Sequence, residues 1–390
     1  MSRKSIIGTV VVSLAILAGL FAWNKRHYAS TGELKVGAIF DLTGSLSYMG
    51  QWSLEGAKLA ESEINSKGGV QGRQLRLVID DAETNPEKAV SAFTRMIGTD
   101  EAKVVLGFNA SSEVMAVAPI ANRSHVVLFS TGGASPGITD AGDYVFRNRL
   151  SGAVEAARMA EIAYNTLGAR RCIVLFINNE YGQGYAEAFR TRFTGLGGSV
   201  TFTEGFAQDQ TDFRAQLEKV RSAMPVDFIY LASHTREAGG ILKQARQRGL
   251  HVQWLASNAV EAPDLFEIAG DAAEGMLFTV EKVERNSPAA ETFITAYKKK
   301  YGREPEMFAA HAYDAVRIIA QILEQKKNDG SEIRDALYGM TNYPGASGMT
   351  SFDKNGDVVK EVALKRVHGN EFQEISENLV SHNATTGRKP

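Results

Sequence analysis

The chain has 390 residues, which is more than one ordinary hydrophobic core accommodates, so two domains are expected. Apolar residues make up 44% and charged residues 23%, a globular balance. Arg3, Lys4, Lys25 and Arg26 are the only charges in the first 32 residues, and the remaining body has 39 basic against 45 acidic residues, a net charge of −6. Nucleic acid is therefore not an expected partner, because duplex binding depends on neutralising phosphates.

The N-terminus carries an uncharged run from Ile6 to Trp23 behind a basic pair. As a helix it would span about 27 Å at 1.5 Å per residue, between a signal-peptide core and a membrane span. Residues 1–32 are therefore predicted to direct export, either as a cleaved signal peptide or as an anchor retained through residues 6–23. The basic residues Lys25 and Arg26, directly after the run, are compatible with an anchor. The expected location is periplasmic or otherwise extracytoplasmic.

From Glu33 onward, short β-rich runs alternate with helical apolar patterns. Strands are predicted at 34–40, 74–80, 103–107 and 126–130, with helices at 53–66, 86–97 and 112–122 between them. After Arg149 the alternation begins again, with strands at 171–177, 199–206, 227–233 and 252–257 and helices at 181–193, 212–223 and 237–248. Strands separated by helices of this length predict parallel sheets covered on both faces. The predicted fold class is α/β, with two doubly wound parallel-sheet lobes.

The last third of the chain has too few predicted strands for another domain. Helices are expected at 289–301, 308–325 and 331–338, followed by a hairpin over 349–367 with its turn at 354–356. These elements are expected to complete the two lobes, which requires the chain to cross between them more than once. The polar tail, 377–390, is predicted to be disordered.

Ligands of open parallel sheets bind outside the carboxyl ends of the strands. Three such ends carry small, hydroxyl-bearing or glycine-rich loops: DLTGSLSYMG (41–50), FNASSE (108–113) and STGGASPG (130–137). Ser111 and Ser112 fall at a helix start, where unpaired N–H groups and the macrodipole favour an anion. The two serines either cap that helix or, with the adjacent glycine loop, form a cradle for a carboxylate or phosphate.

Motifs for catalysis and for cofactor binding are missing. The glycines do not spell G-x-G-x-x-G or a loop ending in Gly-Lys-Ser/Thr, and neither H-E-x-x-H nor G-x-S-x-G occurs. Cys172 opens an apolar run and is interpreted as a core residue rather than a catalytic thiol. His234 and His311 are isolated, which favours polar contacts over metal ligation. We therefore expect no catalytic residue, no cofactor and no metal.

The strand ends of the second half are more aromatic. Tyr181 starts a helix in NNEYGQGY (178–185), and His234 and Asn258 follow later strands. Tyr181 is alternatively a packing residue, and Asn258 alternatively a turn residue. Small, anion-friendly backbone on one half facing aromatic and amide groups on the other predicts a cleft that closes on a small molecule.

The chain resembles the type I periplasmic binding proteins of the leucine/isoleucine/valine-binding branch, the solute receptors of ABC importers. The resemblance runs from about Leu34 to Ile375 and is carried by KVGAIFDLTGSLSYMG, GAKLAESEINSKGGVQGRQLRLVIDDAETNPEKAV, INNEYGQGYAEAF and AGGILKQARQRGL. It implies two lobes joined by three hinge strands, and no catalysis. By the family pattern, lobe one combines 34–150 with 280–343, and lobe two combines 151–279 with 344–376.

The resemblance also implies ligand contacts. Ser111 matches a serine that holds the ligand carboxylate, and Tyr181 matches a tyrosine of the first lobe-two helix. His234 replaces another tyrosine, and Asn258 replaces the acid that pairs with the ligand's ammonium group. A buried ammonium without that acid loses about 3 to 5 kcal/mol, so a keto, hydroxy or aromatic acid is expected in place of an ordinary branched-chain amino acid. Glu237 is a possible substitute counter-charge.

The expected function is that of a monomeric receptor that captures a small carboxylate or amino-acid-like ligand by lobe closure and delivers it to an ABC permease. The predicted ligand-binding residues are Tyr48, Ala110, Ser111, Gly132, Ala134, Ser135, Tyr181, His234 and Asn258. One alternative is a membrane-tethered sensor built on the same two lobes. The other is an α/β enzyme, which the missing nucleophile and cofactor loops disfavour.

Overall fold

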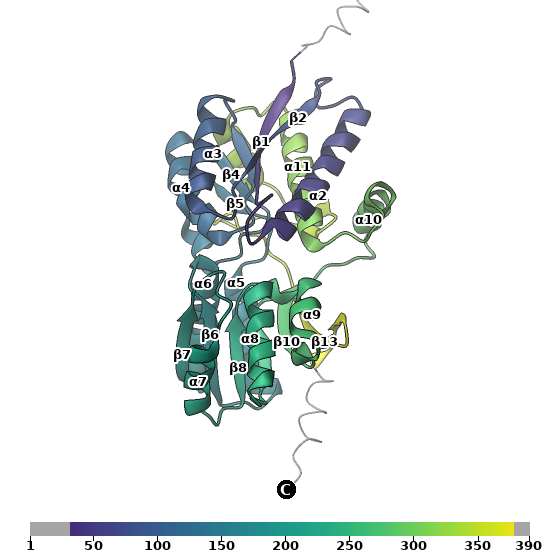
Figure 1. Cartoon of the computed structure of the whole chain (residues 1–390). Coiled ribbons are helices and arrows are strands. Elements are labelled where there is room, and N and C mark those ends of the chain that lie inside the picture. The colour runs from purple at the N-terminus through teal and green to yellow at the C-terminus, as the bar shows by residue number, and fades with distance from the viewer. Residues whose placement is uncertain (1–31, 378–390) are drawn as a thin grey trace, which may run out of the picture.

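The computed structural model describes residues 32–377 as two α/β lobes stacked one above the other (Figure 1). The predicted export segment and residues 378–390 lie outside the described residues. Within 32–377 there is no helix with the length and apolar character that a membrane crossing requires. The predicted α/β fold with two lobes is confirmed, and each lobe is built around its own sheet.

The first lobe surrounds a five-stranded sheet in the order β2–β1–β3–β4–β5, in which all neighbouring strands are parallel. Its strands are β1 (Leu34–Phe40), β2 (Leu75–Asp81), β3 (Val104–Gly107), β4 (Val127–Ser130) and β5 (Val145–Arg147). Its helices are α2 (Ser47–Ser66), α3 (Pro86–Gly98), α4 (Ser111–Ser124), η1 (Pro136–Asp140), α10 (Pro288–Tyr301), α11 (Met307–Glu324) and α12 (Gly330–Tyr338). The helices α2 and α11 pack closely because Gly56 has no side chain: a Cβ there would lie 1.9 Å from the carbonyl oxygen of Ala309.

The second lobe surrounds a seven-stranded sheet in the order β14–β13–β10–β9–β8–β6–β7. Its strands are β6 (Arg171–Ile177), β7 (Ser199–Phe206), β8 (Phe228–Ala232), β9 (Gln253–Ala256), β10 (Leu277–Glu281), β13 (Val362–His368) and β14 (Glu371–Glu374). Its helices are α5 (Gly152–Glu161) with the following turn η2 (Ile162–Thr166), α6 (Glu180–Gly195), α7 (Arg214–Ser222), α8 (Thr235–Gln247), η3 (Asn258–Val260), α9 (Asp264–Ala269) and η4 (Gly270–Ala273). Cys172, in β6, is fully buried and is a core residue as predicted.

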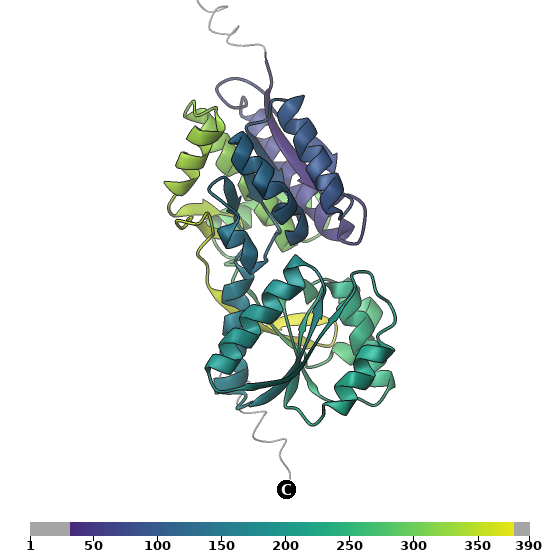
Figure 2. The same cartoon turned by 90° about the vertical axis from the view of Figure 1, so that its left-hand side faces the viewer.

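The chain crosses between the lobes three times, after β5, after β10 and before β13, and Figure 2 shows these connections side-on. The third crossing makes the second sheet mixed rather than purely parallel, because β13 pairs antiparallel with β10 and with β14. An antiparallel edge on a parallel sheet is common in α/β folds.

The predicted hairpin over 349–367 is wrong as a unit. Its first residues form β12 (Gly348–Thr350), which pairs with β11 (Tyr343–Gly345), while its last residues form β13 in the other lobe. Only the turn is as predicted, since Gly356 donates a backbone hydrogen bond to Asp353. Local alternation predicted extended chain correctly, but the pairing partners lie far away in the sequence.

The segment before the third crossing packs on the first lobe. The ring of Phe352 contacts Phe129 and Phe146, with centroids 5.7 and 5.6 Å away, and Asp357 pairs with the buried Arg147, whose Nε lies 2.6 Å from its Oδ1. The expected division assigned these residues, as part of 344–376, to lobe two. We propose that lobe one extends to about residue 358 and that 359–361 form the crossing.

Candidate functional site

The N-terminus of α4 faces the gap between the lobes. Ala110 occupies the N-cap position, and the hydroxyl of Ser111 is turned away from a capping role. Its Oγ instead accepts hydrogen bonds from the backbone N–H groups of Ala134 and Ser135, at 3.2 and 3.0 Å. The oxygen is thereby fixed in place while its own O–H remains free to donate to a ligand, since no acceptor for it occurs within residues 32–377.

The glycine loop after β4 approaches α4 too closely for any larger residue at Gly132. A Cβ there would lie 2.8 Å from the Cα of Asn109 and 3.0 Å from its carbonyl oxygen. Gly132 has ordinary backbone angles, so the lack of space for a side chain is what requires glycine at this position. The close approach holds the loop after β4 beside the start of α4, where its Ala134 and Ser135 N–H groups reach Ser111.

On the second lobe, three side chains at strand ends face this loop cluster. The hydroxyl of Tyr181 donates to Oδ1 of Asn258 at 2.8 Å and accepts from the N–H of Ala259 at 3.2 Å. The ring of His234 lies 5.1 Å from that of Tyr181. Burial lowers the pKa of His234 to about 4, so the imidazole is neutral at neutral pH.

A buried carboxylate, Glu155 of α5, stands behind Asn258. Its Oε2 accepts a hydrogen bond from the hydroxyl of Tyr185 at 2.6 Å and another from the Asn258 amide. Burial raises the pKa of Glu155 to about 7, although the Arg149 guanidinium and the hydrogen bonds from Tyr185 and Asn258 act in the opposite direction. The side-chain amide of Asn258 is therefore held on both of its polar atoms.

Arg149 lies in the first crossing, between β5 and α5, and is 1% exposed. Its Nη1 lies 3.0 Å from Oε2 of Glu281, and its Nη2 lies 3.6 Å from Oε1 of Glu155. Glu281 also contacts His311 and Lys360, at 2.5 and 3.3 Å. Although burial opposes ionisation, these neighbours hold the pKa of Glu281 well below its ordinary value. The crossings are thus joined by a buried ionic cluster.

These elements enclose a cavity between the lobes. It is lined by Leu46, Met49, Asn109, Ala110, Ser111, Gly132, Arg149, Tyr181, His234, Asn258, Ala259 and Phe308. Its volume is about 20 Å³, little more than the roughly 10–15 Å³ that one water molecule requires. An organic ligand therefore needs the lobes to separate or side chains to rotate before it enters.

Side-chain hydrogen bonds from the loop and helix α2 of the first lobe also join the lobes beside this cavity. The hydroxyl of Tyr48 lies 3.3 Å from Oγ1 of Thr235, and Nε2 of Gln208 donates to Oγ of Ser45 at 3.2 Å. Because the Thr235 hydroxyl itself donates to the carbonyl of Ala259, Tyr48 is the donor of the first bond. Both bonds are partly buried side-chain contacts of modest strength.

Six of the nine predicted residues line the cavity, namely Ala110, Ser111, Gly132, Tyr181, His234 and Asn258. The other three lie just outside it. Ala134 and Ser135 contribute N–H groups to Ser111, and the Ser135 hydroxyl accepts from Gly137 at the start of η1. Tyr48 forms the cross-lobe bond to Thr235. Glu237, the proposed substitute counter-charge, accepts from the N–H of Asp209 and is absent from the lining.

Sequence reasoning missed several lining residues. Leu46 and Met49 stand in the loop 41–50 that was singled out, so its apolar residues were an available signal. Asn109 lies in the strand-end loop 108–113, which was also singled out, directly before the two serines. Arg149 and Phe308 carried no such sequence signal. For Arg149 the reason is that the preceding strand, β5, has only three residues and was not predicted.

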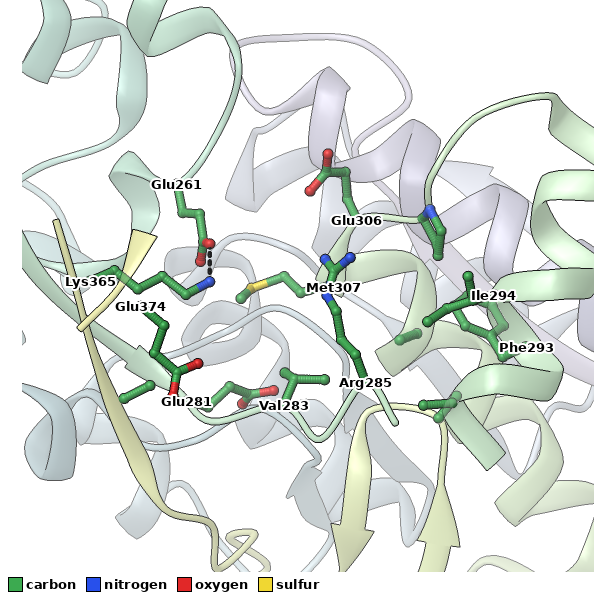
Figure 3. Close-up of a pocket in the computed structure, with 15 residues that line it drawn as sticks. Glu261, Glu281, Val283, Arg285, Phe293, Ile294, Glu306, Met307, Lys365 and Glu374 are labelled. Carbon is green, nitrogen blue, oxygen red and sulfur yellow. Dashed lines mark hydrogen bonds and ion pairs between the residues drawn. The ribbon is translucent and has the colours of Figure 1, made fainter. Parts of the chain in front are cut away.

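A roomier cavity of about 120 Å³ lies on the hinge side of the molecule (Figure 3). Its walls come from both lobes: Phe293, Ile294 and Met307 belong to the first, and Lys365 and Glu374 to the second. Figure 3 shows Lys365 paired with Glu261 at one end and Arg285 reaching between the walls. Among residues 32–377, no set of three or more His, Cys, Asp or Glu is arranged to hold a metal ion.

The family model described as "Periplasmic binding protein" matches residues 33–371. The leucine-, isoleucine-, valine-, threonine- and alanine-binding protein of Pseudomonas aeruginosa is 29% identical over 357 residues, which cover 90% of this chain and 94% of that protein. A leucine-binding protein from Thermotoga maritima superimposes with a TM-score of 0.82 at 32% identity, covering 88% of this chain and 98% of the other.

A branched-chain amino acid transporter substrate-binding protein from Streptococcus pneumoniae, solved with isoleucine, has a TM-score of 0.80 at 28% identity, again over 88% and 98% of the two chains. The chain belongs to the periplasmic binding proteins, a family of solute-binding receptors and not of enzymes. Within it, the chain is a type I member of the branch that includes the leucine/isoleucine/valine receptors.

Proposed function

We propose that the protein is an extracytoplasmic receptor that captures a small carboxylate or amino-acid-like ligand between its lobes and delivers it to an ABC-type importer. The names of its relatives support the class, since they are substrate-binding proteins of transporters or are named for the amino acids they bind. The predicted export segment supports a location outside the cytoplasm. The predicted permease partner and monomeric state are part of this proposal.

The observation that carries the proposal is the convergence of helix N-termini on one interlobe cavity. Lining residues lie in the first turn, or at the N-cap, of α2, α4, α6, α8 and α11. Each N-terminus carries unpaired N–H groups and about half a positive charge from the macrodipole. Within the lining the only ionised side chain is that of Arg149, because His234 is neutral. The electrostatics of the cavity therefore favour an anion.

Closure of the lobes is the proposed capture step. Ser111 and the N–H of Gly132 come from the first lobe, whereas Tyr181, His234 and Asn258 come from the second, so only a closed form contacts the ligand from both sides. A ligand that binds the closed form better shifts the open-to-closed equilibrium toward it. The side-chain hydrogen bonds that join the lobes beside the cavity are of modest strength, so ligand contacts add substantially to the stability of the closed form.

The first test is a thermal-shift screen over amino acids, oxo acids, hydroxy acids and aromatic acids, followed by calorimetry. A ligand at 100 times its Kd adds about 2.7 kcal/mol to the stability of the folded state. With the best ligand, Ser111→Leu is expected to reduce affinity at least about tenfold, because the side chain would fill the cavity and remove the donor hydroxyl.

The matched control is Ser112→Leu, which makes the same change one residue further along α4 at a position that does not line the cavity. It is expected to bind normally. Circular dichroism and a melting curve check that both variants are folded. Unchanged affinity in a folded Ser111→Leu variant would refute this binding site.

A further inference from the structure

Arg149 stands apart from the other residues of the cavity lining. It is the one ionised group in that lining, and it is buried in the crossing that joins the lobes. Nothing in the resemblance assigns a role to this position. Its charge is matched by Glu155 and Glu281, so a purely structural role in the ionic cluster is the competing explanation.

The hydrogen bonds of Arg149 argue against a purely structural role. Its Nη1 lies 3.0 Å from Glu281 but is not directed at the carboxylate, and this buried nitrogen has no hydrogen-bond partner in the described part of the chain. The Oε2 of Glu281 accepts instead from the N–H of Leu150 at 3.0 Å. A buried guanidinium that is balanced in charge but lacks hydrogen bonds retains donors for a further acceptor.

Asn109 offers the complementary group in the same lining. Its amide nitrogen donates to Oγ of Ser53 at 2.9 Å, whereas its Oδ1 is buried and has no donor within residues 32–377. A hydroxyl group satisfies both residues at once, because its oxygen accepts from Arg149 and its proton goes to Asn109. An ammonium group satisfies only Asn109 and is repelled by the guanidinium.

No carboxylate lines the cavity to compensate an ammonium charge. Glu155 is a buried acid of the second lobe whose Oε2 is engaged by Tyr185 and Asn258. Its Oε1 has no hydrogen-bond partner within residues 32–377, but it lies 3.6 Å from Nη2 of Arg149, so the guanidinium already matches its charge. An amino acid would therefore bring its ammonium beside Arg149 without an unmatched carboxylate to compensate it, an arrangement that burial makes costly.

We infer that Arg149 contacts the ligand directly and that the cleft selects a small hydroxy acid, with its carboxylate at Ser111 and the helix N-termini and its hydroxyl between Arg149 and Asn109. This inference rests on the proposed function and names its ligand class. Arg149 is on this view a specificity-determining residue of the receptor.

The test uses four acids of one carbon skeleton: 2-hydroxyisovalerate, 2-oxoisovalerate, isovalerate and valine. The same four head groups on the phenylpropanoate skeleton allow for a larger apolar site. By calorimetry, the hydroxy acid of one series is expected to bind at least about tenfold more tightly than the unsubstituted acid, with the oxo acid between them and the amino acid weakest.

Arg149→Lys is the informative variant, because it keeps the charge between Glu155 and Glu281 and removes the planar fork of donors. It is expected to reduce the preference for the hydroxy acid over the unsubstituted acid to about threefold or less. Lys360→Arg is the control, since it perturbs the same ionic cluster through Glu281 without lining the cavity, and it should leave that preference unchanged. Should Arg149→Lys fail to fold, Asn109→Leu tests the same inference, because it removes the proposed acceptor of the ligand hydroxyl proton.

The outcomes separate this inference from the proposed function. Equal binding of the hydroxy and unsubstituted acids, tightest binding of the amino acid, or an unchanged preference in folded Arg149→Lys overturns the inference and leaves the receptor function standing. If none of the eight compounds binds at millimolar concentration, the small-carboxylate function falls, and this inference falls with it.

Discussion

The two faces of the cleft are built in different ways. The first-lobe face, around Ser111 and Gly132, consists of small residues and backbone groups at the start of α4. The second-lobe face consists of the side chains of Tyr181, His234 and Asn258. Glu155 and Tyr185 hold Asn258 from behind by hydrogen bonds. The first face presents unpaired backbone N–H groups, as any helix N-terminus does. The chemistry of the second face depends on the identity of a few side chains.

This difference assigns separate tasks to the two faces. Under the proposed function, the backbone geometry at the start of α4 binds the carboxylate group, which all acids share. Under the further inference, discrimination among acids depends on Arg149 in the crossing and on the orientation of Asn258. Changes behind the second-lobe face should therefore alter stability and selectivity, while changes at the first should alter affinity for all acids alike.

The largest expected effect concerns Glu155, which supports the second-lobe face. Its pKa, raised to about 7 by burial, exceeds the ordinary value of 4.5, so folding favours the protonated form. The stability from this group is fully present below pH 4.5 and is lost as pH rises toward 7, by about 3 kcal/mol for a shift of this size. Glu155→Gln should remove this loss. Urea unfolding of both proteins at pH 5 and pH 7.5 measures it.

Several charged and titratable groups face Glu155, namely Arg149, Glu281, Tyr185 and Tyr181. The control is Glu161→Gln on the same helix. Although burial acts upward, Arg192 and Arg158 hold the pKa of Glu161 below its ordinary value. Glu161 therefore stabilises the fold above its unfolded pKa, and this stability is lost as pH falls. This pH dependence is opposite to that of Glu155. Parallel pH profiles for wild type and Glu155→Gln would contradict the buried, proton-binding state of Glu155.

A change of intermediate size is expected from Asn258→Asp. The new carboxylate lies beside Glu155, and because two such neighbours do not both ionise, the pair holds one proton and carries one negative charge. The cavity then gains a lining anion, and binding of valine relative to 2-hydroxyisovalerate should rise about tenfold, or about 1.4 kcal/mol. Calorimetry measures the ratio. Asn178→Asp, at an exposed position near the same cleft edge, should leave it unchanged.

The smallest effect is expected from Tyr48→Phe. This change removes the hydrogen bond to Thr235 that joins the two faces directly, a partly exposed contact worth about 0.5–1.5 kcal/mol. The closed form should become less populated, and ligand affinity should fall by up to about tenfold while selectivity stays the same. Small-angle scattering without ligand and calorimetry with it report the two quantities. An altered selectivity would contradict this prediction and show that Tyr48 contacts the ligand directly.

Much of the fold could be predicted because its strands are buried on both faces. The ranges 34–40 and 171–177 coincide with β1 and β6, since continuous apolar runs between helices leave little ambiguity. The range 199–206 coincides with the edge strand β7, where β-branched and aromatic residues alternate with polar ones. The strands β5 and β10 were missed because short runs beside Arg147 and Glu281 do not look buried in sequence. Both acquire that burial only from chain segments far away, as the pairing of Arg147 with Asp357 illustrates.

The site divides in the same way. The position of Ser111 and Tyr181 at the interlobe cavity could be predicted, because ligand sites of parallel sheets lie at strand ends followed by helix starts. Arg149 and Glu155 could not, because a charged residue in an amphipathic pattern indicates a solvated surface until the tertiary structure shows what covers it. The ionic cluster depends on all three crossings meeting, which no local pattern encodes.

The hinge-side cavity of Figure 3 has a consequence of its own. Because Met307 and Lys365 bound it from opposite lobes, any rotation that widens the mouth of the clamp must also reshape this chamber behind it. A compound bound there would fix the clamp at one angle without competing for the solute. Under the proposed function, such a compound would slow delivery of the solute without occupying its site.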